Sequence, residues 1–143
     1  MLVQLSDELS PVFAPRGNTV ALHLAEDLTV EADPEKLARV FSNILKNAAS
    51  YSYPHTEITI SAEKSEHEVI IQFQNSGEDI PSEALASLFD KFYRADKSRS
   101  SDTGGTGLGL AIAKEIVVLH GGTISATSKN HVVTFTISLP LAH

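Results

Sequence analysis

Residues 104–114 read Gly-Gly-Thr-Gly-Leu-Gly-Leu-Ala-Ile-Ala-Lys, so that four glycines within six positions lead straight into an apolar segment of helical character. Glycine has no Cβ, and a ligand can therefore approach this main chain closely. A helix that begins here points its free N–H groups and the positive end of its dipole at the space in front of Gly107. Because phosphate is the anion usually bound at such helix ends, the stretch predicts a phosphate-binding loop. A flexible surface loop is the alternative.

The glycine-rich stretch differs from two familiar nucleotide-binding motifs. No Gly-Lys-Ser/Thr closes it, as a P-loop requires, and it lacks the preceding apolar strand of a dinucleotide-binding turn. The other groups that hold the ligand must therefore come from elsewhere in the chain.

The composition is typical of one acidic domain. A chain of 143 residues can bury a single core. The net charge of -7 comes without a basic block, which argues against binding of nucleic acid or contact with an anionic membrane. There is no cysteine, no apolar run long enough to span a membrane and no signal peptide. Because Met1 lies directly on a helical pattern, we expect a piece of a longer protein.

Hydrophobic spacing predicts an alternation of helices and strands. The first helix is expected over residues 2–13, the second begins at Pro34 with Asp33 as its N-cap, and a short third helix runs through Leu85 and Leu88. In the last helix the pattern places four residues toward the core: Leu108, Ile112, Ile116 and Leu119. Strands are expected over residues 20–24, 28–30, 56–62, 69–75, 123–127 and 132–139, with hairpin turns at residues 64–66 and 128–130.

Three polar or aromatic residues follow one another at four-residue steps on the second helix. Asn43, Asn47 and Tyr51 lie on the border of the apolar stripe, where side chains are half-buried. Asparagine is a poor former of helix interiors, so two on one edge favour amides that bind something or cap nearby backbone. We expect two neutral oxygen ligands for a hard cation such as Mg²⁺, beside the aromatic face of Tyr51. Two solvated amides are the alternative.

Asn75 has the same strand parity as Val69, Ile71 and Phe73, so it points toward the core where the strand ends. A buried amide must find partners, either in a local turn or on the hydrogen-bonding edge of a ligand. Turn capping is the commoner explanation for an isolated case. Further on, residues 95–106 contain no large apolar side chain, carry Lys97 and Arg99 and lead into the glycines, which is typical of a lid.

Four motifs thus follow one another in order: Asn43-xxx-Asn47 on a helix, Asn-Ser-Gly at residues 75–77, Phe-xx-Phe at residues 89–92 and the glycine-rich run at residues 104–110. This order resembles the N, G1, F and G2 boxes of the catalytic ATP-binding domain of sensor histidine kinases, and the resemblance covers essentially the whole chain. Two runs look most like the vancomycin-resistance members of that family: DPEKLARVFSNILKNAASYS and KFYRADKSRSSDTGGTGLGLAIAKEI.

The resemblance implies an α/β sandwich of the GHKL ATP-binding type, with a mixed, mainly antiparallel sheet covered on one face by three main helices. It implies ATP and Mg²⁺ as cofactors. Asn47 and Asn43 then coordinate the metal, Tyr51 lines the adenine pocket and Asn75 recognises the adenine amino group. The other implied nucleotide contacts are Gly77, Ile80, Lys91, Arg94, Arg99, Gly105, Thr106, Gly107, Leu108 and Gly109.

Three positions depart from the family pattern. Asn75 replaces the usual aspartate, Asp79 replaces the second glycine of the same box, and Ser50 replaces a lysine that commonly follows the second asparagine. An asparagine carbonyl can still accept a hydrogen bond from the adenine amino group. Asp79 removes backbone freedom and Ser50 removes a positive charge, which together predict a modest affinity for ATP.

By the same resemblance the chain is the single catalytic domain, residues 1–143, of a membrane-anchored sensor kinase, on the cytoplasmic side and without membrane contact of its own. It is then a protein histidine kinase that phosphorylates a histidine on its own dimerisation domain, with a response regulator downstream. The alternatives are ATP hydrolysis and nucleotide binding without chemistry. Hydrolytic relatives carry a glutamate base where this chain has Asn43, which cannot accept a proton from water. His67-Glu68 is the one His-acid pair, and we expect it at the surface.

Overall fold

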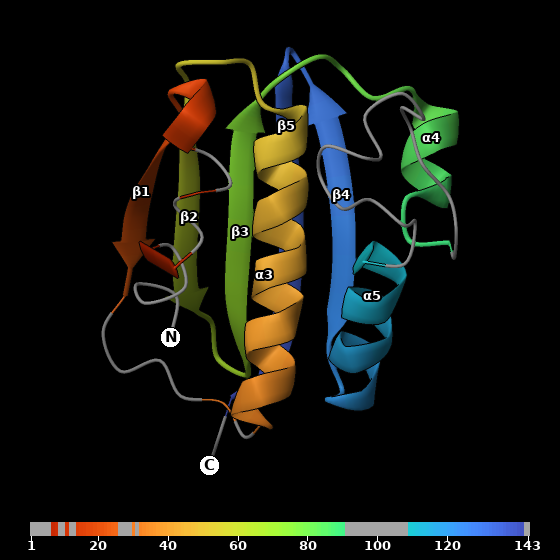
Figure 1. Ribbon diagram of the computed structural model, residues 1–143. Helices are drawn as coiled ribbons and strands as arrows, with labels where there is room; N and C mark the ends of the chain where they lie inside the picture. Colours follow the sequence, from red (N-terminus) through yellow and green to blue (C-terminus); the bar gives the residue numbers. More distant parts are fainter. Residues whose placement is uncertain are drawn as a thin grey trace.

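A five-stranded sheet with helices on one face forms the framework of the protein, and Figure 1 shows this arrangement in the computed structural model. The structure describes residues 7–8, 11, 14–25, 30, 32–90 and 109–141. The strand order is β1-β2-β3-β5-β4, with β1 parallel to β2 and every other pair antiparallel. The strands are β1 (Thr19–Leu24), β2 (Glu57–Lys64), β3 (Glu68–Ser76), β4 (Thr123–Lys129) and β5 (Val132–Pro140). The expected mixed, mainly antiparallel sheet is confirmed.

Helix α3 (Pro34–Tyr51) begins where the sequence predicts. Asp33 is its N-cap, and the Asp33 carboxylate accepts hydrogen bonds from the backbone N–H groups of Glu35 and Lys36. The buried face of α3 lies on the sheet, and the rings of Phe41 and Phe73 are 6.1 Å apart there. Its buried side chains are Leu37, Val40, Phe41, Ile44, Leu45, Ala48, Ala49 and Ser50. The alternation of apolar residues along β2 and β3 supplies the other half of this core.

Two further helices complete the layer. Helix α5 (Gly109–Leu119) lies beside α3 and against β4, and the short helix α4 (Ser82–Ser87) lies near β4 (Figure 1). Leu88 is buried just after α4, and the Phe89 ring meets Phe135 edge-on at 6.4 Å. The predicted short helix is therefore confirmed, and Phe89 is partly buried against the core.

The predicted core face of α5 is partly wrong. Leu119 is 74% exposed, whereas Ala113 and Val117 have no exposed surface. At about 100° per residue, Leu119 lies about 200° around the helix from Val117, on the far side from the sheet. The buried residues are Leu110, Ala111, Ala113, Ile116 and Val117, while Ile112 is only partly buried. Small and branched residues thus form the face of α5 that packs on the core. The hydrophobic spacing favours the larger Leu119 on this face.

Two turn positions also differ from expectation. The turn between β4 and β5 is Asn130-His131 rather than residues 128–130, because β4 continues to Lys129. Both turn residues have positive φ, at 53° and 63°, as a two-residue type I′ hairpin requires. The β2–β3 turn is residues 65–67, one position later than predicted. At the end of α5, Gly121 has a φ of 78° and terminates the helix as expected.

Several predicted segments lie outside the described residues. These are most of the helix at residues 2–13, the short strand at residues 28–30 apart from Val30, Phe92, the lid at residues 95–106, and Leu108. Within the part that is described, no helix is long and apolar enough to cross a membrane.

The stability of two α5 variants checks the revised core face. Val117→Ala removes two methyl groups from a fully buried site and should lower the free energy of unfolding by about 2 kcal/mol. Leu119→Ala on the same helix should change it by less than about 0.5 kcal/mol. Urea unfolding of both variants measures the difference, and an equal loss in the two would contradict the assigned face.

Candidate functional site

The end of the second predicted helix and the Asn-Ser-Gly segment meet at one end of the sheet, where α3 and β3 both terminate (top of Figure 1). The backbone N–H of Tyr53, just after α3, donates to the carbonyl of Ser76 at 2.7 Å and ties these two ends together. The N-terminus of α5 is bonded to Asn43, in the middle of α3. The structure thus brings together residues that are far apart in the sequence.

Asn43 and Asn47 lie half-buried on α3, as expected for the border of its apolar stripe. The Asn43 Nδ2 donates to the carbonyl of Gly109 at 3.0 Å, and the Asn47 Nδ2 donates to the carbonyl of Asn43 at 3.1 Å. These bonds orient both amides through their nitrogens. Their oxygens, which a hard cation prefers as ligands, are not used by either bond. The donor set therefore fits Mg²⁺, and Asn43 also links α3 to the start of α5.

Asn75 is the most unusual polar residue of the site. It is 2% exposed, and both its Nδ2 and its Oδ1 are buried without a hydrogen-bond partner in the described structure. Turn capping, the commoner explanation from sequence, is therefore wrong within that part of the chain. Native proteins rarely leave such groups unpaired. An amide that offers one donor and one acceptor complements a ligand edge with an acceptor beside a donor, such as the N1 and amino group of adenine.

Position 77, two residues after Asn75, must be glycine because the end of α3 packs against it. A Cβ built on Gly77 would lie 2.1 Å from the backbone oxygen of Tyr51 and 3.3 Å from Asn75 Nδ2. No side chain fits at the first distance, so Gly77 permits the close approach of the two segments. Ile80, three residues further on, is 8% exposed and faces the core. Tyr51 is half-buried at the end of α3.

Asp79 and Ser50, two of the positions that depart from the family pattern, have structural roles. The Asp79 Oδ1 accepts a hydrogen bond from the backbone N–H of His131 at 2.7 Å, and Ser50 is buried in α3 with 8% of its surface exposed. Sequence reasoning missed His131 and Ser128, which contact the segment after Asn75 from the β4–β5 hairpin. They are about fifty residues away in the sequence and carry no motif, so only the sheet topology reveals them.

Of the predicted phosphate-binding end, only Gly109, the first residue of α5, lies within the described residues. A Cβ there would meet Asn43 at 3.8 Å, which is ordinary contact, so the approach of Asn43 alone does not require glycine. The other predicted phosphate-end residues lie outside the described residues: Lys91, Arg94, Arg99, Gly105, Thr106, Gly107 and Leu108.

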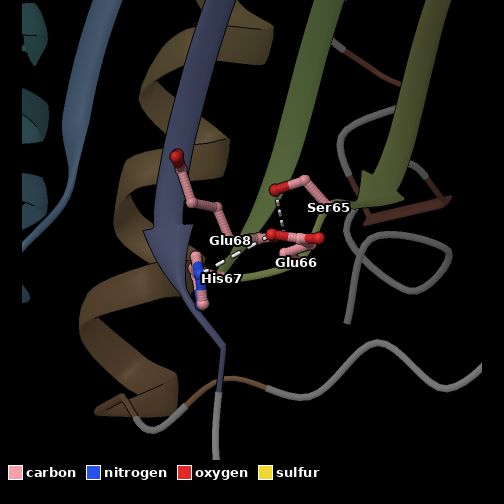
Figure 2. Close-up of polar contacts among 4 residues, drawn as sticks. All are labelled: Ser65, Glu66, His67 and Glu68. Atoms are coloured by element: carbon pink, nitrogen blue, oxygen red, sulfur yellow. Dashed lines mark hydrogen bonds and ion pairs between the residues drawn. The ribbon is translucent and has the colours of Figure 1, made fainter.

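His67 lies at the opposite end of the sheet from this site. Figure 2 shows it in the β2–β3 turn with Ser65 and Glu66, next to Glu68 at the start of β3, and its ring is 3.8 Å from the Glu66 carboxylate. Its side chain is 87% exposed, so the expected surface position is confirmed. Strand β3 separates the turn from Asn75 by on the order of 25 Å at the usual rise per residue. His67 therefore cannot reach a ligand held at Asn75.

Comparison with known proteins agrees with this geometry. Residues 32–143 match the family of histidine kinase-, DNA gyrase B- and HSP90-like ATPases. The chain is 56% identical over 140 residues to the sensor protein VanS of Enterococcus faecium, covering 98% of this chain and 36% of that protein. It is 42% identical over 140 residues to the sensor protein VanSC of Enterococcus gallinarum, covering 98% of this chain and 38% of that protein.

Solved structures show the same fold. The catalytic domain of the histidine kinase ThkA matches with a TM-score of 0.81 and 29% identity, covering 98% of this chain and 92% of that one. The mycobacterial sensor histidine kinase MprB matches with a TM-score of 0.82 and 26% identity, covering 98% and 95%. The chain spans less than two fifths of the curated relatives but nearly the whole of these two structures. It therefore belongs to the family of histidine kinase-, DNA gyrase B- and HSP90-like ATPases, as the catalytic ATP-binding domain of a sensor histidine kinase.

Proposed function

We propose that this domain binds Mg-ATP and transfers the γ-phosphoryl group to a histidine on the dimerisation domain of its own sensor kinase, in vancomycin-resistance signalling. The observation that carries the proposal is the buried, unpartnered amide of Asn75 beside Gly77, in a chain 56% identical to VanS. The response regulator of the pathway is the downstream partner of the full-length protein. The domain itself faces the cytoplasm.

Each described site residue has a role in this proposal. Asn75 reads the adenine edge, while Gly77, Ile80 and Tyr51 surround the base. Asn47 and Asn43 hold Mg²⁺, which supplies charge compensation for the phosphates when bound. Gly109 and Asn43 fix the start of α5, whose N-terminal N–H groups favour an anion.

The roles proposed for residues 91–108 rest on the sequence alone. Lys91, Arg94 and Arg99 contribute positive charge to the phosphates, and Gly105, Thr106, Gly107 and Leu108 shape the loop around them. Catalysis in this scheme consists of positioning and electrostatic stabilisation, with water excluded by the lid.

The nucleophile comes from another domain. His67 is exposed and at the far end of β3, and Asn43 stands where hydrolytic relatives have their glutamate base. An amide cannot take a proton from water, which disfavours ATP hydrolysis. A nucleotide-binding module without chemistry is the second alternative.

Adenine recognition is tested by Asn75→Leu, which replaces the amide by an apolar group of similar size. The variant should bind ATP at least about ten-fold more weakly, because the lost pairing is worth roughly 1–3 kcal/mol in a desolvated site. Without nucleotide it should be as stable as the unmutated domain or more so, since two unpaired polar atoms are removed from the core. Calorimetry and urea unfolding measure the two effects. Equal affinity of the unmutated domain for ATP and GTP would contradict adenine-specific recognition.

The metal assignment is tested by Asn47→Ala, with Lys46→Ala as a control at the neighbouring exposed position. Removal of the amide oxygen should abolish most of the increase in ATP affinity that Mg²⁺ produces, while Lys46→Ala should keep it. Titration of each protein with ATP, with and without Mg²⁺, provides the comparison. The same Mg²⁺ response in Asn47→Ala and in the unmutated domain would refute the assignment.

Phosphotransfer separates the kinase from its alternatives. The chain alone should bind ATP with little self-phosphorylation or hydrolysis, and addition of the dimerisation domain of its parent at high concentration should yield phosphohistidine on that domain. His67→Ala should not change this yield. Labelled ATP with acid-labile product analysis gives the readout. Phosphate release without phosphohistidine favours hydrolysis, and neither product despite tight binding favours a binding module.

A further inference from the structure

The segment Gly77–Ile80 is held mainly by the β4–β5 hairpin. The N–H of Gly77 donates to the carbonyl of His131 at 3.0 Å, and the N–H of His131 donates to Asp79 Oδ1 at 2.7 Å. The N–H of Ile80 donates to Ser128 Oγ at 2.8 Å. One residue of the turn, His131, thus forms hydrogen bonds to the segment through both its backbone N–H and its carbonyl.

The same turn also contacts the end of α3. The hydroxyl of Tyr53 lies 3.1 Å from His131 Nδ1, and the two rings are 6.2 Å apart. The N–H of Tyr53 is bonded to Ser76, directly before Gly77. The hairpin turn, the end of α3 and the chain that follows Asn75 therefore form one connected unit.

This unit depends on a side chain that the family pattern does not have. A glycine at position 79 cannot accept a hydrogen bond through a side chain, whereas the Asp79 carboxylate binds an N–H whose residue is in the left-handed conformation, with φ at 63°. A bond between a carboxylate and a backbone N–H is charge-assisted and stronger than a neutral one. Asp79 therefore fixes the turn to the segment that carries Gly77 and Ile80.

We propose that Asp79 is a positioning residue for the nucleotide base, acting through the Asn130-His131 turn on the segment beside Asn75. The inference rests on the proposed function and deepens it, because it assigns the adenine end of the site a second support from the β4–β5 hairpin, which carries none of the four motifs. The effect of Asp79 is confined to the binding of the base. The phosphate end is attached through Asn43 and Gly109 and does not share these bonds.

The test compares Asp79→Ala with Asp79→Asn and Glu78→Ala. Asparagine keeps an oxygen that can accept from His131, and Glu78 is an adjacent exposed carboxylate of the same charge with no hydrogen bond to the described hairpin. Amide exchange of His131, measured by NMR without nucleotide, reports the bond itself. Calorimetry with ATP and GTP, each with and without Mg²⁺, measures how the bond affects nucleotide binding. The ratio of ATP to GTP affinity reports on the base, and the Mg²⁺ response reports on the phosphates.

Asp79→Ala should speed amide exchange at His131 and weaken the binding of ATP about five-fold. This is the size of effect expected for one hydrogen bond of this kind. It should reduce the preference for ATP over GTP and leave the ratio of affinities with and without Mg²⁺ unchanged. Asp79→Asn should restore most of the affinity, and Glu78→Ala should resemble the unmutated domain.

Faster exchange with unchanged ATP affinity would overturn the positioning role, as would an equal loss in Asp79→Ala and Glu78→Ala or a parallel loss of the Mg²⁺ response. These outcomes differ from failure of the proposed function. In that case Asn75→Leu binds ATP as well as the unmutated domain does, whatever Asp79→Ala shows.

Discussion

The amide of Asn75 is buried at the end of β3 with neither of its polar atoms paired in the described structure, and this one constraint organises the site around it. Burial of such a group without partners costs roughly 1–3 kcal/mol, which the free protein carries and a ligand with a complementary edge can recover. Gly77 lets the end of α3 approach the segment after Asn75 closely, because any Cβ there would meet the backbone of Tyr51. The unpaired amide thus lowers the stability locally, which is common at binding sites.

The two ends of the proposed nucleotide site are attached to the fold by different bonds. The phosphate end depends on Asn43, which joins α3 to Gly109 at the start of α5. The base end depends on the β4–β5 hairpin, whose residues Ser128 and His131 hold the segment after Asn75. Both helices rest on the same sheet, with Val117 and Phe73 fully buried in the shared core. The core therefore sets the distance between the two ends, and the local bonds set the orientation of each.

Much of this could be predicted from the sequence, because strong local signals coincide with the fold. Asp33-Pro34 fixed the start of α3, and strand parity alone placed Asn75 in the core. The errors fall where local pattern and tertiary packing disagree. Leu119 fits the helical spacing but faces solvent, since the helix packs through the smaller Ala113, and β4 runs on to Lys129 because its partner strand β5 continues to pair there. The bond between Asp79 and His131 joins residues 52 positions apart and leaves no local signal.

Within the described residues the Asn75 side chain makes no hydrogen bond, and we propose that it makes its hydrogen bonds to the adenine base. The most direct measurement is the NMR signal of the Asn75 side-chain amide in the ¹⁵N-labelled domain, without nucleotide and with saturating ATP or GTP. ATP should shift this signal downfield and slow its exchange with water, and GTP should do neither. A signal that is unchanged by ATP under conditions where ATP is bound would show that Asn75 does not bind the base.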